Sequence, residues 1–250
     1  MKKQYLLILF TMWNIINLNA QETFIAESIP ESIKKQITGK SWVPNELIQL
    51  EDLRYLSISF LGFDNKLHVG HMIVNKDIAQ EVLQIFKELF DQKFQIEKMQ
   101  LIDNYFKEGL PLNEIDNLSV DDNNTYCFFF YRTVDPSKFI SEHSTGMAID
   151  INPRVNPWLS SYMCPKDAQN YLDREQKNIK GFINTESSCY TIFQKYGWVW
   201  GGDWRNVKDY HHFSKNGRCP QWFVDTSVEP EWIKAKVEIP DSLKKEIQNS

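Results

Sequence analysis

The residues best suited to chemistry lie in two segments that are far apart in the chain. The first segment, residues 141–150, reads Ser-Glu-His-Ser-Thr-Gly-Met-Ala-Ile-Asp and places His143 seven residues before Asp150. Apolar residues alternate with small or polar ones from 147 to 152, which predicts a strand with Asp150 on its open face. A carboxylate within an apolar strand loses hydration energy unless it is paired or binds a cation. Taken alone, however, such a pair is more commonly a surface aspartate and a loop histidine.

The second segment contains acids and imidazoles next to a stretch rich in glycine and tryptophan. Residues 200–204 read Trp-Gly-Gly-Asp-Trp, and residues 209–213 read Asp-Tyr-His-His-Phe. Two imidazoles and one carboxylate form a ligand set that leaves the fourth position of a zinc ion for water. A further carboxylate, three residues before the last ligand, can act as a general base on that water. The two segments together therefore indicate a catalytic zinc site.

The patterns Ser-x-His-x-x-Gly-x-Ala-x-Asp and Asp-x-x-His resemble those of zinc peptidases that cut bacterial cell-wall stem peptides. These are the D-alanyl-D-alanine carboxypeptidases and dipeptidases of the VanY and VanX type, and the L-alanyl-D-glutamate endopeptidases of phages and bacilli. The resemblance implies that His143, Asp150 and His212 bind Zn²⁺ and that Asp209 is the catalytic base. It extends over roughly residues 53–213, although only the two motifs are specific.

The resemblance also suggests roles for four other residues. Arg132, which follows an apolar run, resembles the family arginine that holds the substrate or stabilises the transition state. The hydroxyl of Ser141 is expected directly behind the zinc ligands. Trp200 and Trp204 either line the substrate cleft or pack in the core, and the sequence leaves both interpretations open.

Two neighbouring histidines compete for the last ligand position. Many members of the family have proline before the last histidine, whereas this chain has His211. His212 lies three residues after Asp209, as the motif requires, and it is therefore the predicted ligand.

Other candidate residues are interpreted as structural. His68 and His71 are three apart on a predicted strand and therefore lie on opposite faces. The neighbouring acids Asp121 and Asp122 are expected to be solvated, and Asp203 is expected in a turn. No Gly-x-Ser-x-Gly motif or phosphate-binding loop occurs, so serine hydrolase and nucleotide chemistry have no support.

The elements that must position these residues predict an α+β fold. Alternating residues predict strands over 53–61 and 67–74, joined by the turn Asp64-Asn65-Lys66. One helix is predicted from an N-cap at Asn75 to Phe90, and another over 188–195. Residues 99–102 resemble a further strand, and residues 153–180 an irregular surface excursion. The resemblance implies a small antiparallel sheet flanked by helices, with a zinc cleft on the sheet face, as in hedgehog and D-Ala-D-Ala peptidase domains.

Length and composition restrict the class of protein. The chain has 250 residues, which suffices for one domain, and its 42% hydrophobic and 24% charged residues exclude a disordered chain or a multi-spanning membrane protein. A formal net charge of −5 argues against nucleic-acid binding, because phosphates require a cationic surface.

The N-terminus resembles a secretory signal peptide. Lys2 and Lys3 precede an uncharged, mostly apolar stretch, and Ala20 provides a small residue at a plausible cleavage point before Gln21. An uncleaved anchor is the alternative. We therefore expect a signal peptide over 1–20, a loosely structured or helical lead-in over 21–52, and a zinc peptidase domain over 53–250. The protein is expected to be exported, periplasmic or extracellular, with no membrane span after signal removal.

Export would allow disulfides to persist. The four cysteines, Cys127, Cys164, Cys189 and Cys219, allow three connectivities that the sequence does not separate. None belongs to a Cys-x-x-Cys pair, so a thiolate zinc site is not predicted.

The expected function is metal-assisted hydrolysis of a peptidoglycan stem peptide at a bond next to a D-amino acid. Arg132 could bind the free carboxylate that an exopeptidase recognises. The Trp-Gly-Gly-Asp-Trp stretch and an aspartate as base instead resemble the L-alanyl-D-glutamate endopeptidases. The alternative is a non-catalytic, zinc-containing module that binds cell wall, like the hedgehog domain, but the presence of both the ligand set and Asp209 argues against it.

Overall fold

The computed structural model describes residues 21–45, 47–129, 133–134, 139–160, 163–205 and 207–216. The α-helices of this part are α1 (Glu31–Ile37), α2 (Ala79–Asp91), α3 (Leu112–Asp121) and α4 (Ser188–Lys195). Short 3-10 helices are η1 (Leu50–Asp52), η2 (Ile102–Tyr105), η3 (Glu142–Thr145), η4 (Gln169–Tyr171) and η5 (Gly201–Asp203). The strands are β1 (Phe24–Ser28), β2 (Leu53–Leu61), β3 (Leu67–Asn75), β4 (Lys98–Met99), β5 (Asn124–Thr125), β6 (Thr133–Val134), β7 (Phe139–Ile140), β8 (Ala148–Asp150), β9 (Trp158–Leu159), β10 (Met163–Cys164), β11 (Val199–Trp200), β12 (Lys208–Asp209) and β13 (His212–Ser214).

The strands form several small sheets. Their orders are β1-β2-β3, β10-β9-β12 and β11-β13-β8, with β4-β5 and β6-β7 as separate pairs. All of these pairings are antiparallel except β4-β5. The predicted α+β fold with small antiparallel sheets and helices is therefore confirmed.

The first hairpin forms where the alternation predicts it. β2 and β3 pair along their full length, and Asn65 in the connecting turn has a φ of 61°, a left-handed conformation that asparagine tolerates. The predicted N-cap at Asn75 is wrong, because Asn75 pairs with Leu53 as the last residue of β3. Its side chain accepts a hydrogen bond from the Asp77 backbone N–H at 3.0 Å, and α2 begins only at Ala79.

The segment before the hairpin is more regular than predicted. Instead of a loose or helical lead-in, residues 24–28 form strand β1, which pairs with β2 over Phe24 to Ser28. Ile25, on the far side of this strand, is half exposed. The apolar run Phe24-Ile25-Ala26 therefore hides the alternation that a strand with one buried face usually shows. The helix over 188–195 is confirmed as α4, whereas α3 was not predicted.

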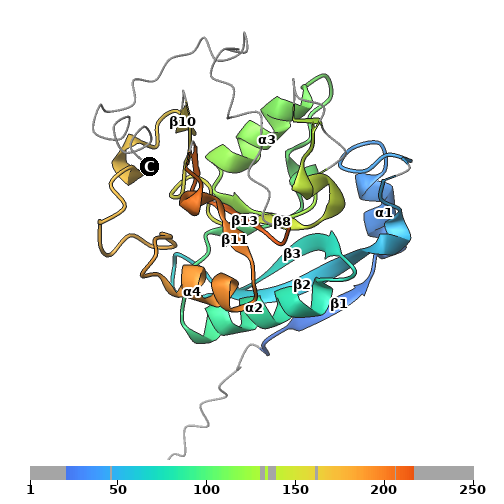
Figure 1. The fold of residues 1–250 in the computed structure, drawn as a ribbon. Coiled ribbons are helices and arrows are strands. Elements are labelled where there is room, and N and C mark those ends of the chain that lie inside the picture. Colours follow the sequence, from blue (N-terminus) through green and yellow to red (C-terminus); the bar gives the residue numbers. More distant parts are fainter. Residues whose placement is uncertain are drawn as a thin grey trace, which may run out of the picture.

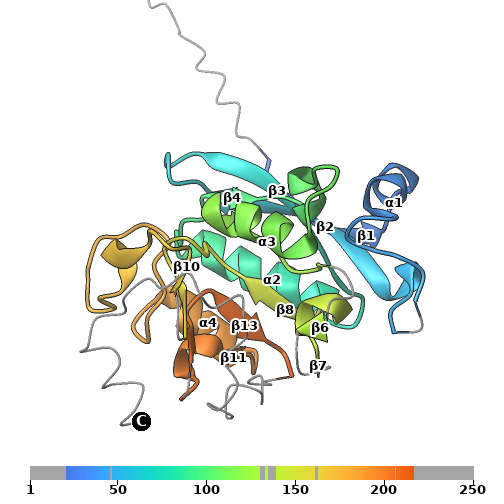
Figure 2. The same cartoon turned by 90° about the horizontal axis from the view of Figure 1, so that it is seen from above.

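The largest of three hydrophobic clusters among the described residues joins the two halves of the chain. Helix α2 packs its buried residues Val82, Ile85, Phe86 and Leu89 against Leu56, Ile58, Met72 and Val74 of the first sheet. The same core contains Ile149 of β8 and Phe213 of β13. In Figure 1, α2 and α4 lie side by side below the strands and α3 lies above them; in the view from above in Figure 2, α3 is therefore in front of α2. The strands that carry the two motifs are thereby fixed against the N-terminal sheet.

No helix in the part of the chain that the structure describes is long and apolar enough to cross a membrane. The predicted signal peptide, residues 1–20, lies outside the described residues.

Phe86→Ala is expected to destabilise the fold by about 3–5 kcal/mol, because Phe86 is 1% exposed and its removal leaves a cavity between α2 and the sheet. Urea unfolding measures the loss. The matched control is Gln84→Ala on the exposed face of the same helix, which should change the free energy of unfolding little. Equal effects of the two substitutions would contradict this description of the core.

Candidate metal centre

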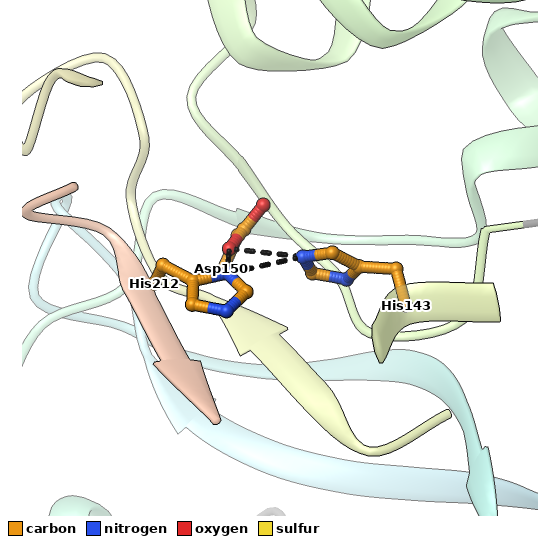
Figure 3. A group of neighbouring side chains, drawn as sticks. All are labelled: His143, Asp150 and His212. Carbon is orange, nitrogen blue, oxygen red and sulfur yellow. Dashed lines mark hydrogen bonds and ion pairs between the residues drawn. The ribbon is translucent and has the colours of Figure 1, made fainter. Parts of the chain in front are cut away.

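Three separate elements bring His143, Asp150 and His212 together, as Figure 3 shows. His143 lies in η3, Asp150 is the last residue of β8, and His212 is the first residue of β13. The antiparallel pairing of β13 with β8 places His212 directly opposite Asp150. Because directly opposite residues project from the same face of a sheet, this register brings the imidazole next to the carboxylate.

The geometry of the three side chains fits a metal ion. Oδ1 of Asp150 lies 3.0 Å from Nδ1 of His212 and 3.3 Å from Nε2 of His143, and these two nitrogens are 3.3 Å apart. In a tetrahedral zinc site with bonds of about 2.0–2.1 Å, ligand atoms stand about 3.3 Å from one another. One oxygen and two imidazole nitrogens therefore already occupy the corners that a zinc ion requires.

The ring of His143 is held by two buried neighbours. Its Nδ1 lies 2.6 Å from the carbonyl oxygen of Cys127, which can only accept, so Nδ1 carries the proton. The lone pair of Nε2 is then free to face Asp150, an arrangement typical of metal-binding histidines. Tyr126 stacks on the imidazole at 5.2 Å between ring centroids. Tyr126 also forms an isolated bridge with Asp150, so the same residue supports both ligands.

The electrostatics of the cluster are dominated by one buried carboxylate. Asp150 is 4% exposed. Burial by itself would raise the pKa of this carboxyl, but the imidazoles of His143 and His211 hold the pKa well below its usual range. Burial likewise disfavours the charged form of His212, yet Asp150 raises the pKa of this histidine. The site thus stabilises an ionised aspartate and draws positive charge toward it.

The loop before β8 is shaped by Ser141 and Gly146. Oγ of Ser141 accepts a hydrogen bond from the backbone N–H of His143 at 3.3 Å and so caps η3. Gly146 ends η3 with a φ of 68°, and a Cβ there would lie 2.6 Å from the backbone nitrogen of Asn75. The structure therefore places Ser141 behind the ligand cluster, where it supports the turn that carries His143.

Asp209 adjoins the cluster through His211. It lies on β12, and its Oδ1 is 3.0 Å from Nε2 of His211. The same nitrogen is 3.7 Å from Oδ2 of Asp150. Burial opposes the protonation of His211, but Asp209 and Asp150 outweigh this effect and raise the pKa of His211 to about 10. His212 belongs to the compact cluster with His143, whereas His211 links two carboxylates.

The glycine pair in Trp-Gly-Gly-Asp-Trp allows the chain to pass close to Asp209. A Cβ on Gly201 would lie 2.6 Å from the carbonyl oxygen and 2.8 Å from the Cβ of Asp209. A Cβ on Gly202 would meet the ring of Trp200 at 2.4 Å. A side chain at position 201 would displace the segment that carries Asp209, and one at position 202 would displace the ring of Trp200.

The two tryptophans of this stretch have different surroundings. Trp200 packs in the core, 3% exposed, and donates a hydrogen bond from Nε1 to the carbonyl oxygen of Tyr210 at 2.9 Å. Trp204 lies with its ring centroid 5.4 Å from that of His212, and its buried Nε1 has no hydrogen-bond partner. Only Trp204 of this pair is therefore next to the metal cluster.

The remaining predicted residues lie elsewhere. Arg132 falls outside the described residues, as does Cys219. The other cysteines, Cys127, Cys164 and Cys189, are free thiols. His68 pairs with Asp64 at 2.9 Å and lies outside the cluster.

Sequence reasoning missed the residues that support the site through backbone or packing. They are Tyr126, the carbonyl of Cys127, and Asn156, whose carbonyl oxygen lies 2.8 Å from Nδ1 of His211. No spacing pattern in the sequence points to any of them. A backbone acceptor can belong to any residue type, so only the tertiary fold identifies it.

The segment that holds the whole cluster is also the one that matches a protein-family model. Residues 135–215 match the family model described as D-alanyl-D-alanine carboxypeptidase. The resemblance to these peptidases is confirmed. The match includes His143, Asp150, Asp209 and His212, begins after Arg132, and supports a metallopeptidase that acts on cell-wall peptides. Searches of curated proteins and of solved structures found no significant match to the chain.

Gly201→Ala is expected to lower the hydrolysis of cell-wall peptides by about 10²-fold, because a displacement of roughly 1 Å at a reacting group has this effect. The added methyl group must push Asp209 away, whereas η3, β8 and β13 and the three candidate ligands that they carry remain in place. Turnover and zinc content of the purified variant test this. Unchanged turnover would show that the position of Asp209 is unimportant.

Proposed function

We propose that the chain is an exported zinc metallopeptidase that hydrolyses peptidoglycan stem peptides at a bond next to a D-amino acid. The observation that carries the proposal is the triangle of ligand atoms, 3.0–3.3 Å on each side, within a segment that matches the D-alanyl-D-alanine carboxypeptidase family. His143, Asp150 and His212 would hold the ion. Bound zinc would polarise the scissile carbonyl and lower the pKa of water at the site.

The carboxylate of Asp209 is proposed as the general base. Its side chain is 15% exposed, so it is sheltered but reachable by water. Asp209 would take the proton from the attacking water and pass it to the nitrogen of the leaving amine. A separate base is needed, because Asp150 is committed to the metal and lies at the buried end of β8.

Substrate contacts are proposed for two further residues. Trp204, whose ring lies beside that of His212, would line the substrate cleft. Arg132 is proposed to hold the substrate or share the negative charge that develops in the transition state, on the family resemblance alone. Trp200 is too deeply packed to contact substrate.

Two cleavage specificities fit the proposal. The matching family model is described as D-alanyl-D-alanine carboxypeptidase, whereas the Trp-Gly-Gly-Asp-Trp stretch resembles L-alanyl-D-glutamate endopeptidases. Mass spectrometry of peptidoglycan fragments incubated with the zinc-loaded protein distinguishes them. Loss of terminal alanine indicates the first bond, and separation of L-alanine from the rest of the peptide indicates the second. Binding without cleavage would establish a cell-wall binding module and overturn the proposal.

Asp209→Ala is expected to retain zinc but to lower turnover by about 10²–10⁴-fold, the usual contribution of a general base. Asp203→Ala serves as the control, because Asp203 is an exposed acid of the neighbouring η5 helix and should leave turnover near that of the unchanged protein. Metal analysis and peptide hydrolysis are measured together. Loss of zinc from Asp209→Ala would instead make Asp209 a ligand.

His212→Ala is expected to lower zinc affinity by more than about 100-fold, beyond the range of about 10–100-fold for residues that only orient a ligand. His211→Ala, on the preceding residue, should stay within that range. Zinc titration with a competing chelator measures both affinities. The assignment of His212 fails if His211→Ala loses the metal and His212→Ala keeps it.

A further inference from the structure

We infer that His211 is a positioning residue, which holds the carboxylate of Asp209 in place by linking it to the fixed backbone of Asn156. The inference rests on the proposed role of Asp209 as base. It concerns the position at which this chain departs from the proline common in the family.

The contacts of His211 define a bridge. The imidazole is 6% exposed, and its Nδ1 lies 2.8 Å from the carbonyl oxygen of Asn156. Because that oxygen can only accept, Nδ1 is the donor and Nε2 is directed toward the site. Nε2 lies 3.0 Å from Oδ1 of Asp209 and 3.7 Å from Oδ2 of Asp150. One ring therefore joins a backbone carbonyl to the base and to a metal ligand.

Asn156 is a rigid anchor for this bridge. It is fully buried, and its side chain forms hydrogen bonds in two directions. The amide nitrogen donates to the carbonyls of Ile151, Asn152 and Gly181 at 2.9–3.2 Å, and Oδ1 accepts from the guanidinium of Arg174 and from the backbone of Ile183 at 2.7–2.8 Å. Because these hydrogen bonds fix Asn156, a group that is bound to its carbonyl oxygen is also held in place.

Asp209 depends on His211 more than on its own strand. β12 is only two residues long, and the buried Oδ1 of Asp209 forms no aligned hydrogen bond, so its contact is the ion pair with His211. A buried carboxylate oxygen without a partner is strongly unfavourable. Without the imidazole, Asp209 would also face the charge of Asp150 directly. Removal of His211 is therefore expected to turn the Asp209 carboxylate away from the site.

Two amide variants separate positioning from packing. Gln at position 211 places an N–H group at the distance of Nε2, beside Asp209, whereas Asn matches Nδ1 and retains only the contact with Asn156. We therefore expect His211→Asn to lower kcat by about 10–100-fold with a KM within about threefold of the original value. His211→Gln is expected to restore part of kcat, because it keeps the contact with Asp209 but not the link to Asn156. Both variants should retain zinc. The substrate is the stem peptide whose cleavage the peptidoglycan digestion identifies.

If His211 serves only to fill space or to bind Asn156, His211→Asn should be at least as active as His211→Gln. That order of activities would overturn the inference. A double-mutant cycle gives a second criterion. In the Asp209→Ala background, His211→Asn should change the residual rate by less than about twofold, because it acts through a carboxylate that is already absent. An undiminished effect in that background would also contradict the inference.

A crystal structure of His211→Asn provides a readout besides activity. The expected result is an Asp209 carboxylate rotated away from its original place, with His143, Asp150 and His212 unmoved. An unmoved Asp209 would reject the inference even if the protein proved to be no peptidase. Failure of the proposed function is seen separately, as absence of peptide cleavage by the unchanged protein.

Discussion

The burial of one carboxylate governs the architecture around it. Asp150 ends a strand whose other residues lie in the core, and an ionised group in such a place must be compensated by positive charge. The compensation comes from imidazoles on neighbouring segments rather than from solvent. A divalent cation at this place would supply the same positive charge, and His143 and His212 would then be neutral nitrogen ligands.

The fold brings the histidines to Asp150 through the register of two paired strands and through glycines that let chain segments approach closely. Pairing of β13 with β8 fixes His212 against Asp150, and the left-handed Gly146 turns the chain so that η3 carries His143 back over the strand. Gly201 lets the η5 segment pass beside Asp209. Each device acts on the backbone, and together they bring the three candidate metal ligands within reach of one another.

The segment with the family match shares its core with residues that precede it. Ile149 and Phe213 face away from the metal cluster and pack in the cluster of residues that also holds Leu56 and Phe86, which lie before the matched region. The N-terminal sheet and α2 thus provide the apolar surface on which the catalytic strands are mounted. The matched residues and their N-terminal support are therefore expected to fold cooperatively.

Much of this could be predicted from the sequence. Local alternation predicted β2, β3 and α4 with correct bounds or nearly so, and motif spacing selected His143, Asp150 and His212, because side-chain type and periodicity are properties of the chain itself. Tertiary structure alone decided the rest. The start of α2, the packing of Trp200 in the core and the bridge from Asn156 through His211 to Asp209 depend on contacts between distant segments. Such contacts are absent from any local pattern, because they arise only when the sheets pair and the core closes.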